Sequence, residues 1–232
     1  MISPVLLNIG NVHRLVLFTV ACSALPAAGP IDFPVALNTR WTYHQHTELG
    51  QGVHFNEEDE KLAKGNVLDK VVISTATGLD MIGAVKYTRV ETRQMDGKSV
   101  LTEWYASTPS GLLLGKTREA DGSEITMSPP QRLLILPVAP DAAWTWKDTI
   151  SPVSMVANIV GTVSIRVPAG TYQAIETSHV TTIRTQATPI VVKQSRWYAP
   201  GVGYVKQDFE THIGTHLINH VVTTLDKFEL GH

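Results

Sequence analysis

Histidines are the residues of this chain whose type and spacing most directly suggest chemistry. Imidazole nitrogens are common ligands of zinc and other transition metals. Because alternate residues of a β-strand share a face, His44 with His46, and His216 with His220, could each present two nitrogens to one ion. No cysteine and no acidic triplet lies beside them to complete a metal site. The sequence therefore favours solvent-facing histidines, predicts no cofactor, and leaves these four as the candidate metal ligands.

Two further segments are similar to known ligand loops but depart from them. Residues 110–117, SGLLLGKT, have the glycines of a phosphate-binding loop one residue too close together. The acidic run 57–60 lacks the alternating oxygen ligands and the central glycine of a calcium loop, so we interpret it as a solvated loop. The sequence also lacks the Gly-x-Ser-x-Gly, Ser-x-x-Lys and His-Glu-x-x-His motifs of common hydrolases. It therefore favours a protein without enzymatic activity.

Two short phrases each occur twice in the same order. Residues 33–43, FPVALNTRWTY, are echoed at a constant offset by residues 136–146, LPVAPDAAWTW. Farther along, Trp104 and Trp197 each begin the phrase Trp-Tyr-Ala. Such a duplication predicts two quasi-equivalent halves, in which the repeated indole rings plug the core.

Apolar and polar residues alternate along most of the chain, which is the pattern of strands with one buried face. Tight turns are predicted at two Asp-Gly steps and at a Pro-Ala-Gly step, and strands joined in this way must be antiparallel. A sheet of about ten strands twists, curls or closes. We therefore predict an all-β fold with minor α content: a single curved antiparallel sheet, or open β-barrel, built from two pseudo-repeat halves with a short helix or two at most. Residues 81–94 are predicted as one strand, and helical turns are allowed only near residues 57–63 and 129–134.

The clearest alternating strand also defines the predicted binding surface. Along residues 155–167 the apolar side chains share one face, and soluble proteins rarely expose apolar patches larger than a few hundred Å². This face therefore needs a covering partner, and the repeated indoles offer stacking surfaces. The residues predicted to bind an apolar ligand are Met155, Ile159, Val163, Trp104 and Trp197.

The first 29 residues have the composition of an export signal. Arg14 precedes an apolar run at residues 15–21, and small residues with Pro26 follow it. The run is shorter than the roughly 20 residues that cross a bilayer. Cys22, the only cysteine, follows a Thr-Val-Ala triplet that resembles the lipidation box of bacterial lipoproteins. We expect Cys22 to be either lipidated or removed with the signal.

These patterns give a predicted domain organisation and location. Residues 1–29 are predicted to be the signal peptide, and residues 30–232 to be a single antiparallel β domain with halves at about 33–119 and 136–229. The protein is expected in the periplasm, at the outer membrane or outside the cell, with membrane contact only through a lipid anchor. Because 19 basic residues nearly balance 21 acidic ones and no basic stripe is present, nucleic acid is not an expected partner.

Three phrases of the mature chain resemble a family of bacterial exported proteins and lipoproteins of unknown function, the TapB-like family. They are residues 33–43, the turn Val-Pro-Ala-Gly-Thr-Tyr at 167–172, and the stretch at 197–206 that contains Tyr-Ala-Pro-Gly-Val-Gly. The resemblance implies an antiparallel open barrel similar to the periplasmic carriers of lipoproteins. It implies no catalytic residues.

Three function classes remain open at this point. The leading hypothesis is an exported envelope protein that binds an acyl chain, lipid or apolar peptide on a concave sheet. The second is a structural or protein-interaction module of the envelope, and the third is a hydrolase-type enzyme. A fully plugged concavity would favour the second hypothesis, and a concavity filled with polar residues would favour the third.

Overall fold

Twelve antiparallel strands form one sheet in this protein. The structure is a computed structural model and describes residues 36–231; the predicted export signal and Cys22 lie outside this part of the chain. The first six strands are β1 (Arg40–Leu49), β2 (Val67–Ile82), β3 (Val85–Gln94), β4 (Ser99–Thr108), β5 (Gly111–Glu119) and β6 (Glu124–Ile135). The other six are β7 (Ala143–Lys147), β8 (Val153–Val167), β9 (Gly170–Ile183), β10 (Ile190–Ala199), β11 (Gly203–Ile213) and β12 (His216–Glu229). The predicted all-β class is confirmed.

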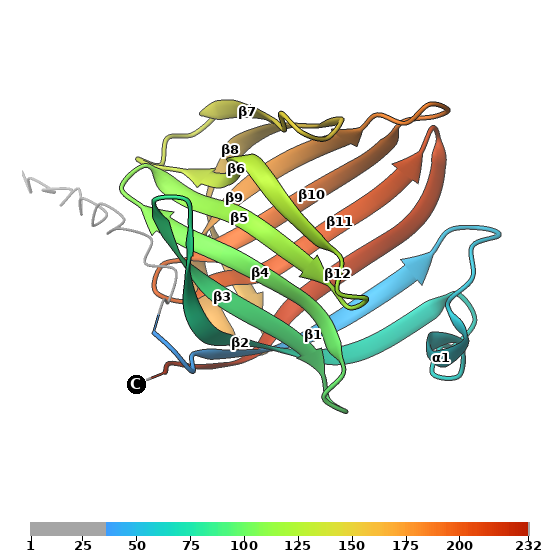
Figure 1. Cartoon of the computed structure of the whole chain (residues 1–232). Helices are drawn as coiled ribbons and strands as arrows, with labels where there is room; N and C mark the ends of the chain where they lie inside the picture. Colours follow the sequence, from blue (N-terminus) through green and yellow to red (C-terminus); the bar gives the residue numbers. More distant parts are fainter. Residues whose placement is uncertain (1–35, 232) are drawn as a thin grey trace, which may run out of the picture.

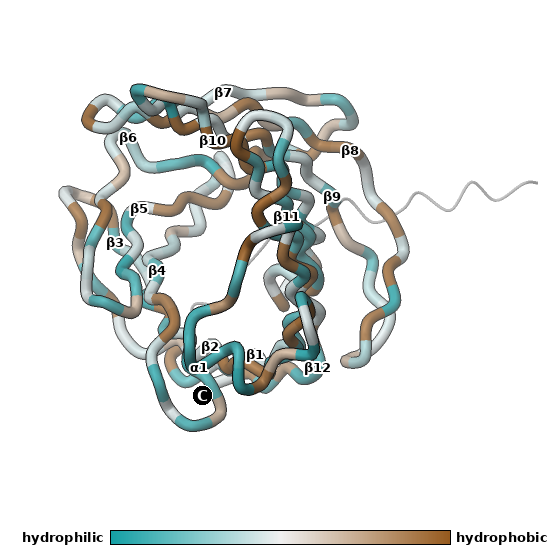
Figure 2. The backbone as a smooth tube through the Cα atoms, turned by 90° about the vertical axis from the view of Figure 1, so that its right-hand side faces the viewer, coloured by the Kyte–Doolittle hydropathy of each residue, from teal (hydrophilic) through white to brown (hydrophobic). Residues whose placement is uncertain are grey.

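The sheet curls until its two edges approach each other. The strand order is β6-β5-β4-β3-β2-β1-β12-β11-β10-β9-β8-β7, so the first and second halves meet at the β1–β12 pair and the edges are β6 and β7 (Figure 1). Figure 2, which views the molecule from the end near α1, shows the strands arranged as a ring. The protein is therefore an antiparallel barrel with one unsealed seam, between β6 and β7.

Side chains fill the barrel at the end where β1 begins. The main core cluster includes the start of β1, the start of β11 and the end of β12, represented by Trp41, Val205 and Leu225, each with 1% or less of its surface exposed. Strand alternation places these residues inside, because every second side chain of a strand points to the same face. This end of the barrel is plugged by its own residues.

From residue 36 onward, the first repeated phrase folds into the same turn as its copy at residues 139–146. Asn38 and Asp141 occupy equivalent positions, and both adopt left-handed backbone conformations, with φ of 67° and 59°. The N–H of Asn38 donates to the carbonyl of Ala76 over 2.8 Å, and that of Asp141 to the carbonyl of Ile159 over 3.0 Å. Asparagine and aspartate tolerate this backbone region better than other residues with a side chain. The repeated sequence thus specifies a repeated entry into each half.

The second repeated phrase also keeps its geometry. Trp104 lies opposite Lys116 and Trp197 lies opposite Lys206, and in both pairs of strands the register shifts immediately after the tryptophan. Each lysine ammonium lies over its indole ring, at 4.8 Å and 4.7 Å from the centroid. Such cation–π contacts stabilise exposed sites by about 0.5–1 kcal/mol.

Two local predictions differ from the structure, and a third segment adopts the helical turn that the sequence allowed near residues 57–63 in place of a solvated loop. Residues 81–94 do not form one strand, because the chain turns at Gly83, whose φ of 60° suits glycine, and β3 begins at Val85. Residues 129–134 belong to strand β6 and not to a helical turn, since consecutive prolines hold the preceding backbone extended. The acidic run forms the single helical turn α1 (Glu57–Glu60), whose N-terminus is capped by the side chain of Asn56. No helix within residues 36–231 is long and apolar enough to cross a membrane.

Candidate ligand-binding cavity

An interior cavity lies beyond the plugged end of the barrel, toward α1. It has a volume of about 200 Å³ and is bordered by seven strands. Its lining residues are Gln45, Val72, Thr92, Val100, Leu101, Glu103, Tyr105, Arg196, Tyr204, Gln207, Phe209 and Thr223. The cavity therefore combines an apolar wall with polar groups at its base.

Two of the twelve lining residues, Glu103 and Arg196, carry opposite charges. Each directly precedes a repeated Trp-Tyr-Ala phrase, so the two side chains occupy equivalent positions in the two halves. They interact electrostatically across the barrel, and both are half-buried because part of each side chain borders the cavity. Two charges held in a barrel interior need such pairing, since an isolated charge there would be strongly destabilising.

Hydrogen bonds hold the guanidinium of Arg196 in place. Its Nε donates to Oε1 of Gln207 over 3.1 Å, and Nη1 donates to the hydroxyl of Tyr198 over 3.4 Å. Burial alone would lower the pKa of Arg196, but Tyr198, Tyr105 and Glu103 more than offset this and raise it. Arg196 is therefore a fixed cation at the base of the cavity.

Opposing influences act on the pKa of the Glu103 carboxyl group. Desolvation by burial raises its pKa, although Arg196 and a hydrogen bond from Tyr105 favour the ionised form and limit the rise. Burial likewise raises the pKa of the Tyr105 hydroxyl well above its usual value. The tyrosines around the pair therefore stay protonated and act as hydrogen-bond donors.

A tyrosine stack separates the cavity from the core. The rings of Tyr43 and Tyr204 are parallel, with centroids 4.8 Å apart and an interplanar angle of 6°. The hydroxyl of Tyr43 donates to the carbonyl of Tyr204 over 3.0 Å. Since only Tyr204 lines the cavity, the stack forms its floor and Tyr43 belongs to the core beneath.

The residues predicted to bind an apolar ligand do not come together in this cavity. Met155 and Ile159 are fully buried, in core clusters under β7 and at the plugged end, while Val163 is half-buried farther along β8. Trp104 alternates with the cavity residues of β4 and packs in a separate cluster, where its Nε1 donates to Asp80 over 2.7 Å. Trp197 is half-buried beneath Lys206, next to Arg196 in sequence.

Three of the four candidate metal ligands, His44, His46 and His220, lie within ion-pair distance of acidic side chains. His46 Nδ1 is 2.8 Å and His44 Nε2 is 3.5 Å from Oδ1 of Asp69, and His220 Nε2 is 2.8 Å from Oδ1 of Asp208. Hydrogen bonds to Asp69 and then to Glu48 raise the pKa of His46. A register shift between His216 and His220 breaks the alternation that would place them together. Within residues 36–231 no group of three or more histidine, cysteine or acidic residues is arranged to hold a metal ion.

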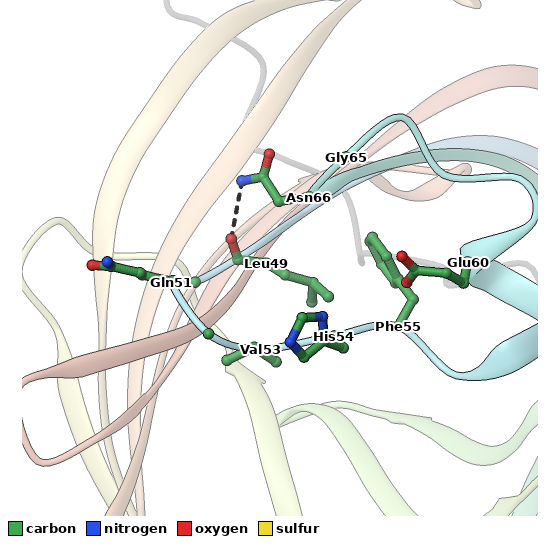
Figure 3. A pocket seen from close by; sticks show the side chains of 10 residues that line it. Leu49, Gln51, Val53, His54, Phe55, Glu60, Gly65 and Asn66 are labelled. Atoms are coloured by element: carbon green, nitrogen blue, oxygen red, sulfur yellow. Dashed lines mark hydrogen bonds between the residues drawn. The ribbon is translucent and has the colours of Figure 1, made fainter.

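Further hollows lie away from this cavity. One, of about 570 Å³, is formed by the loop between β1 and β2, where the Asn66 side chain donates to the carbonyl of Leu49 (Figure 3). Most of its lining residues, such as Gln51 and His54, are exposed. Another, of about 330 Å³, follows the seam and is lined by Leu113, Pro129, Pro130, Arg132, Trp144, Thr145 and Trp146.

Sequence reasoning missed the paired charges Glu103 and Arg196. A signal for them was present, since they precede the same repeated phrase in the two halves and a barrel built from a duplication brings equivalent positions face to face. A charged residue in a strand of an antiparallel sheet usually faces solvent, whereas here both charges line the interior cavity.

Comparisons with known proteins give a partial family match and two similar folds. A family model described as DUF3108-like matches residues 155–212, from β8 to β11. A candidate lipoprotein of Parabacteroides distasonis is 15% identical, with a TM-score of 0.46 over 85% of this chain and 97% of that chain. A candidate exported protein of Bacteroides fragilis with a YmcC-like fold is 12% identical, with a TM-score of 0.41 over 84% of this chain and 99% of that chain. No curated protein matches, and the TapB-like name is not confirmed by these matches.

Proposed function

We propose that this protein is an exported envelope protein that binds an acyl-bearing ligand inside its barrel, without bond chemistry. The observation that carries the proposal is the half-filled interior. Side chains plug the end where β1 begins, while the other end keeps a cavity with apolar walls and a hydrogen-bonding base. Small-molecule sites in proteins commonly have this mixed lining.

The size of the cavity limits which part of a ligand it can hold. A volume of about 200 Å³ is below the roughly 300–1,000 Å³ of sites that enclose a drug-sized molecule. The cavity therefore fits the polar end of a ligand and the first part of its chain. Val100, Leu101 and Phe209, which are half-buried on the cavity wall, would contact that chain.

The export part of the proposal rests on the predicted signal at residues 1–29. Fractionation of cells that carry a C-terminally tagged chain tests it directly. Recovery of the chain outside the cytoplasm, with a mature terminus between about residues 22 and 30, is the expected result. Full-length protein in the cytoplasm would contradict it.

Binding is tested by titrating delipidated protein with the uncharged fluorescent probe N-phenyl-1-naphthylamine. Phe209→Glu places a charge on the cavity wall and should weaken probe binding by about tenfold or more, because burying an unpaired charge is costly. Val156→Glu is the matched control, since Val156 has 60% of its surface exposed, lies on strand β8 of the same half of the sheet and does not line the cavity. Absence of probe binding, or equal binding by wild type and Phe209→Glu, would overturn the proposal.

A second candidate, an envelope interaction module, is favoured by the groove along the seam. There Trp144 and Trp146 line a hollow of about 330 Å³ together with Pro129 and Pro130. Tryptophan and arginine are enriched in the energetically important parts of interfaces, and Arg132 lines the same groove. Failure of every ligand titration, together with a partner cross-linked at the seam, would make this the better account.

A further inference from the structure

The charged pair at the base of the cavity specifies the class of head group. We infer that the ligand presents an uncharged carbonyl, as an ester or amide of an acyl chain, to Arg196, and that Glu103 excludes free carboxylates. This inference rests on the proposed function, because it assumes that the cavity holds the polar end of the ligand. It adds the chemical class of head group that the cavity accepts.

Arg196 supplies the hydrogen-bond donors for such a group. A guanidinium has five N–H donors and no acceptor. Among residues 36–231, Gln207 and Tyr198 engage two of them, which leaves donors for a ligand oxygen at the cavity surface. A carbonyl oxygen accepts such hydrogen bonds without bringing a charge into the barrel.

Glu103 sets the charge balance of the site. It is the acidic residue of the cavity lining, and it already interacts with the one cation there. A carboxylate head group would place a second negative charge beside Glu103 and would compete with it for Arg196. Like charges that share a desolvated site repel each other, and specificity commonly comes from such a repulsive element.

The surrounding residues favour the same head group. Gln45 and Gln207 offer amide groups that both donate and accept hydrogen bonds, and the Tyr105 hydroxyl is held protonated by burial. Glu103 can accept a hydrogen bond from an amide N–H or a hydroxyl of the ligand. The base of the cavity thus has no net charge and offers both hydrogen-bond donors and acceptors, which matches esters and amides.

The test compares three ligands of equal chain length. Decanoate, methyl decanoate and decanamide displace N-phenyl-1-naphthylamine from delipidated protein near pH 8, where the free acid is ionised. The ester and the amide should displace the probe at concentrations about tenfold lower than decanoate, a difference of about 1.4 kcal/mol. Equal or stronger displacement by decanoate would overturn the inference, even if the cavity does bind acyl chains.

A charge-removing variant sharpens the result. Glu103→Gln keeps the shape of the side chain but removes the repulsion, so decanoate should gain about tenfold in affinity while the ester changes little. Glu210→Gln, which alters a carboxylate that pairs with His212 and does not line the cavity, is the matched control. Thermal melting shows whether each variant folds, and the three-ligand comparison on wild type decides the matter if Glu103→Gln does not fold. Binding of no ligand and no probe would instead defeat the proposed function.

Discussion

The two junctions between the halves of the sheet are held together in different ways. At the sealed junction, β1 pairs with β12 along its whole length, from Arg40 opposite Glu229 to Leu49 opposite Asn219. At the seam, no backbone ladder joins β6 and β7 within the described residues. Yet these two strands, like β12 and β1, are the last strand of one half and the first strand of the other. The same duplicated plan thus gives one closed and one open junction.

Isolated hydrogen bonds, two of them from indole side chains, replace the backbone ladder at the seam. The indole Nε1 of Trp144 donates to the carbonyl of Arg132 over 2.9 Å, and that of Trp146 donates to the carbonyl of Pro129 over 2.8 Å. Next to them, the N–H of Thr149 donates to the carbonyl of Ser128. The edges are therefore bridged at a few points only.

Two features of the sequence explain the difference. Pro129 and Pro130 have no N–H to donate, and they lie where the pairing of β6 with β5 is also interrupted. In addition, β7 has 5 residues, whereas its counterpart β1 has 10. Short and proline-containing edges are also a protection against uncontrolled pairing with other chains. Whether a junction closes therefore depends on the residues of the two edge strands and not on the duplicated phrases.

The largest expected effect is a difference in stability between variants of two equivalent tryptophans, Trp41 and Trp144. Trp41→Ala should lower the free energy of unfolding by about 3–5 kcal/mol, because the ring is 1% exposed and its Nε1 donates to the carbonyl of Val202. Trp144→Ala at the seam should cost less, since that ring is half-buried. Thermal or urea unfolding of both variants measures the difference. An equal loss in the two would show that the junctions contribute equally to stability.

Acid should weaken the seam half through His179. This histidine is 1% exposed and packs edge-on against Trp144, with ring centroids 5.7 Å apart, and burial followed by repulsion from Arg196 lowers its pKa to about 3. Because the unfolded chain binds the proton near pH 6.5, stability is complete above that pH and falls as the pH drops toward the folded value. Between pH 6.5 and about 4.5 the loss is about 2–3 kcal/mol.

Denaturant unfolding as a function of pH measures this loss, and His179→Gln should flatten the curve in that range. An unchanged pH dependence in the variant would assign the acid sensitivity to other groups. On the sealed side the raised pKa of His46 acts in the opposite direction: its contribution is present at low pH and is lost as the pH rises through its folded pKa. The side chains of His46 and Asp69 are 37% and 53% exposed to solvent, so we expect a small effect there.

The smallest expected effect concerns the indole bridges. Trp146→Phe removes the hydrogen bond to the carbonyl of Pro129 while keeping most of the ring, and should cost about 1 kcal/mol. Hydrogen exchange should then accelerate in β6 and β7 while the amides of β1 and β12 keep their protection. Acceleration of all four strands together would mean that the seam opens only when the whole barrel unfolds.

The sequence by itself determined the class of the fold and its repeated elements. Alternation along residues 155–167 and the turn residues specify antiparallel strands, because strand period and turn conformation are local properties. The paired turns at Asn38 and Asp141, and the lysines stacked on Trp104 and Trp197, follow from the duplicated phrases in the same way. The consecutive prolines of β6 are also visible in the sequence, but no local sequence feature shows which strand they will face.

Only the tertiary structure decided what the barrel encloses. Glu103 and Arg196 are far apart in the chain and look like ordinary strand charges, yet curling of the sheet turns both inward and makes them partners. The same curling buries Met155 and Ile159 in the core, where they do not line the cavity. It also leaves His44 and His46 beside Asp69 of the neighbouring strand β2. Which face of a strand is enclosed depends on the curvature and register of the whole sheet, and these are set by contacts between residues distant in sequence.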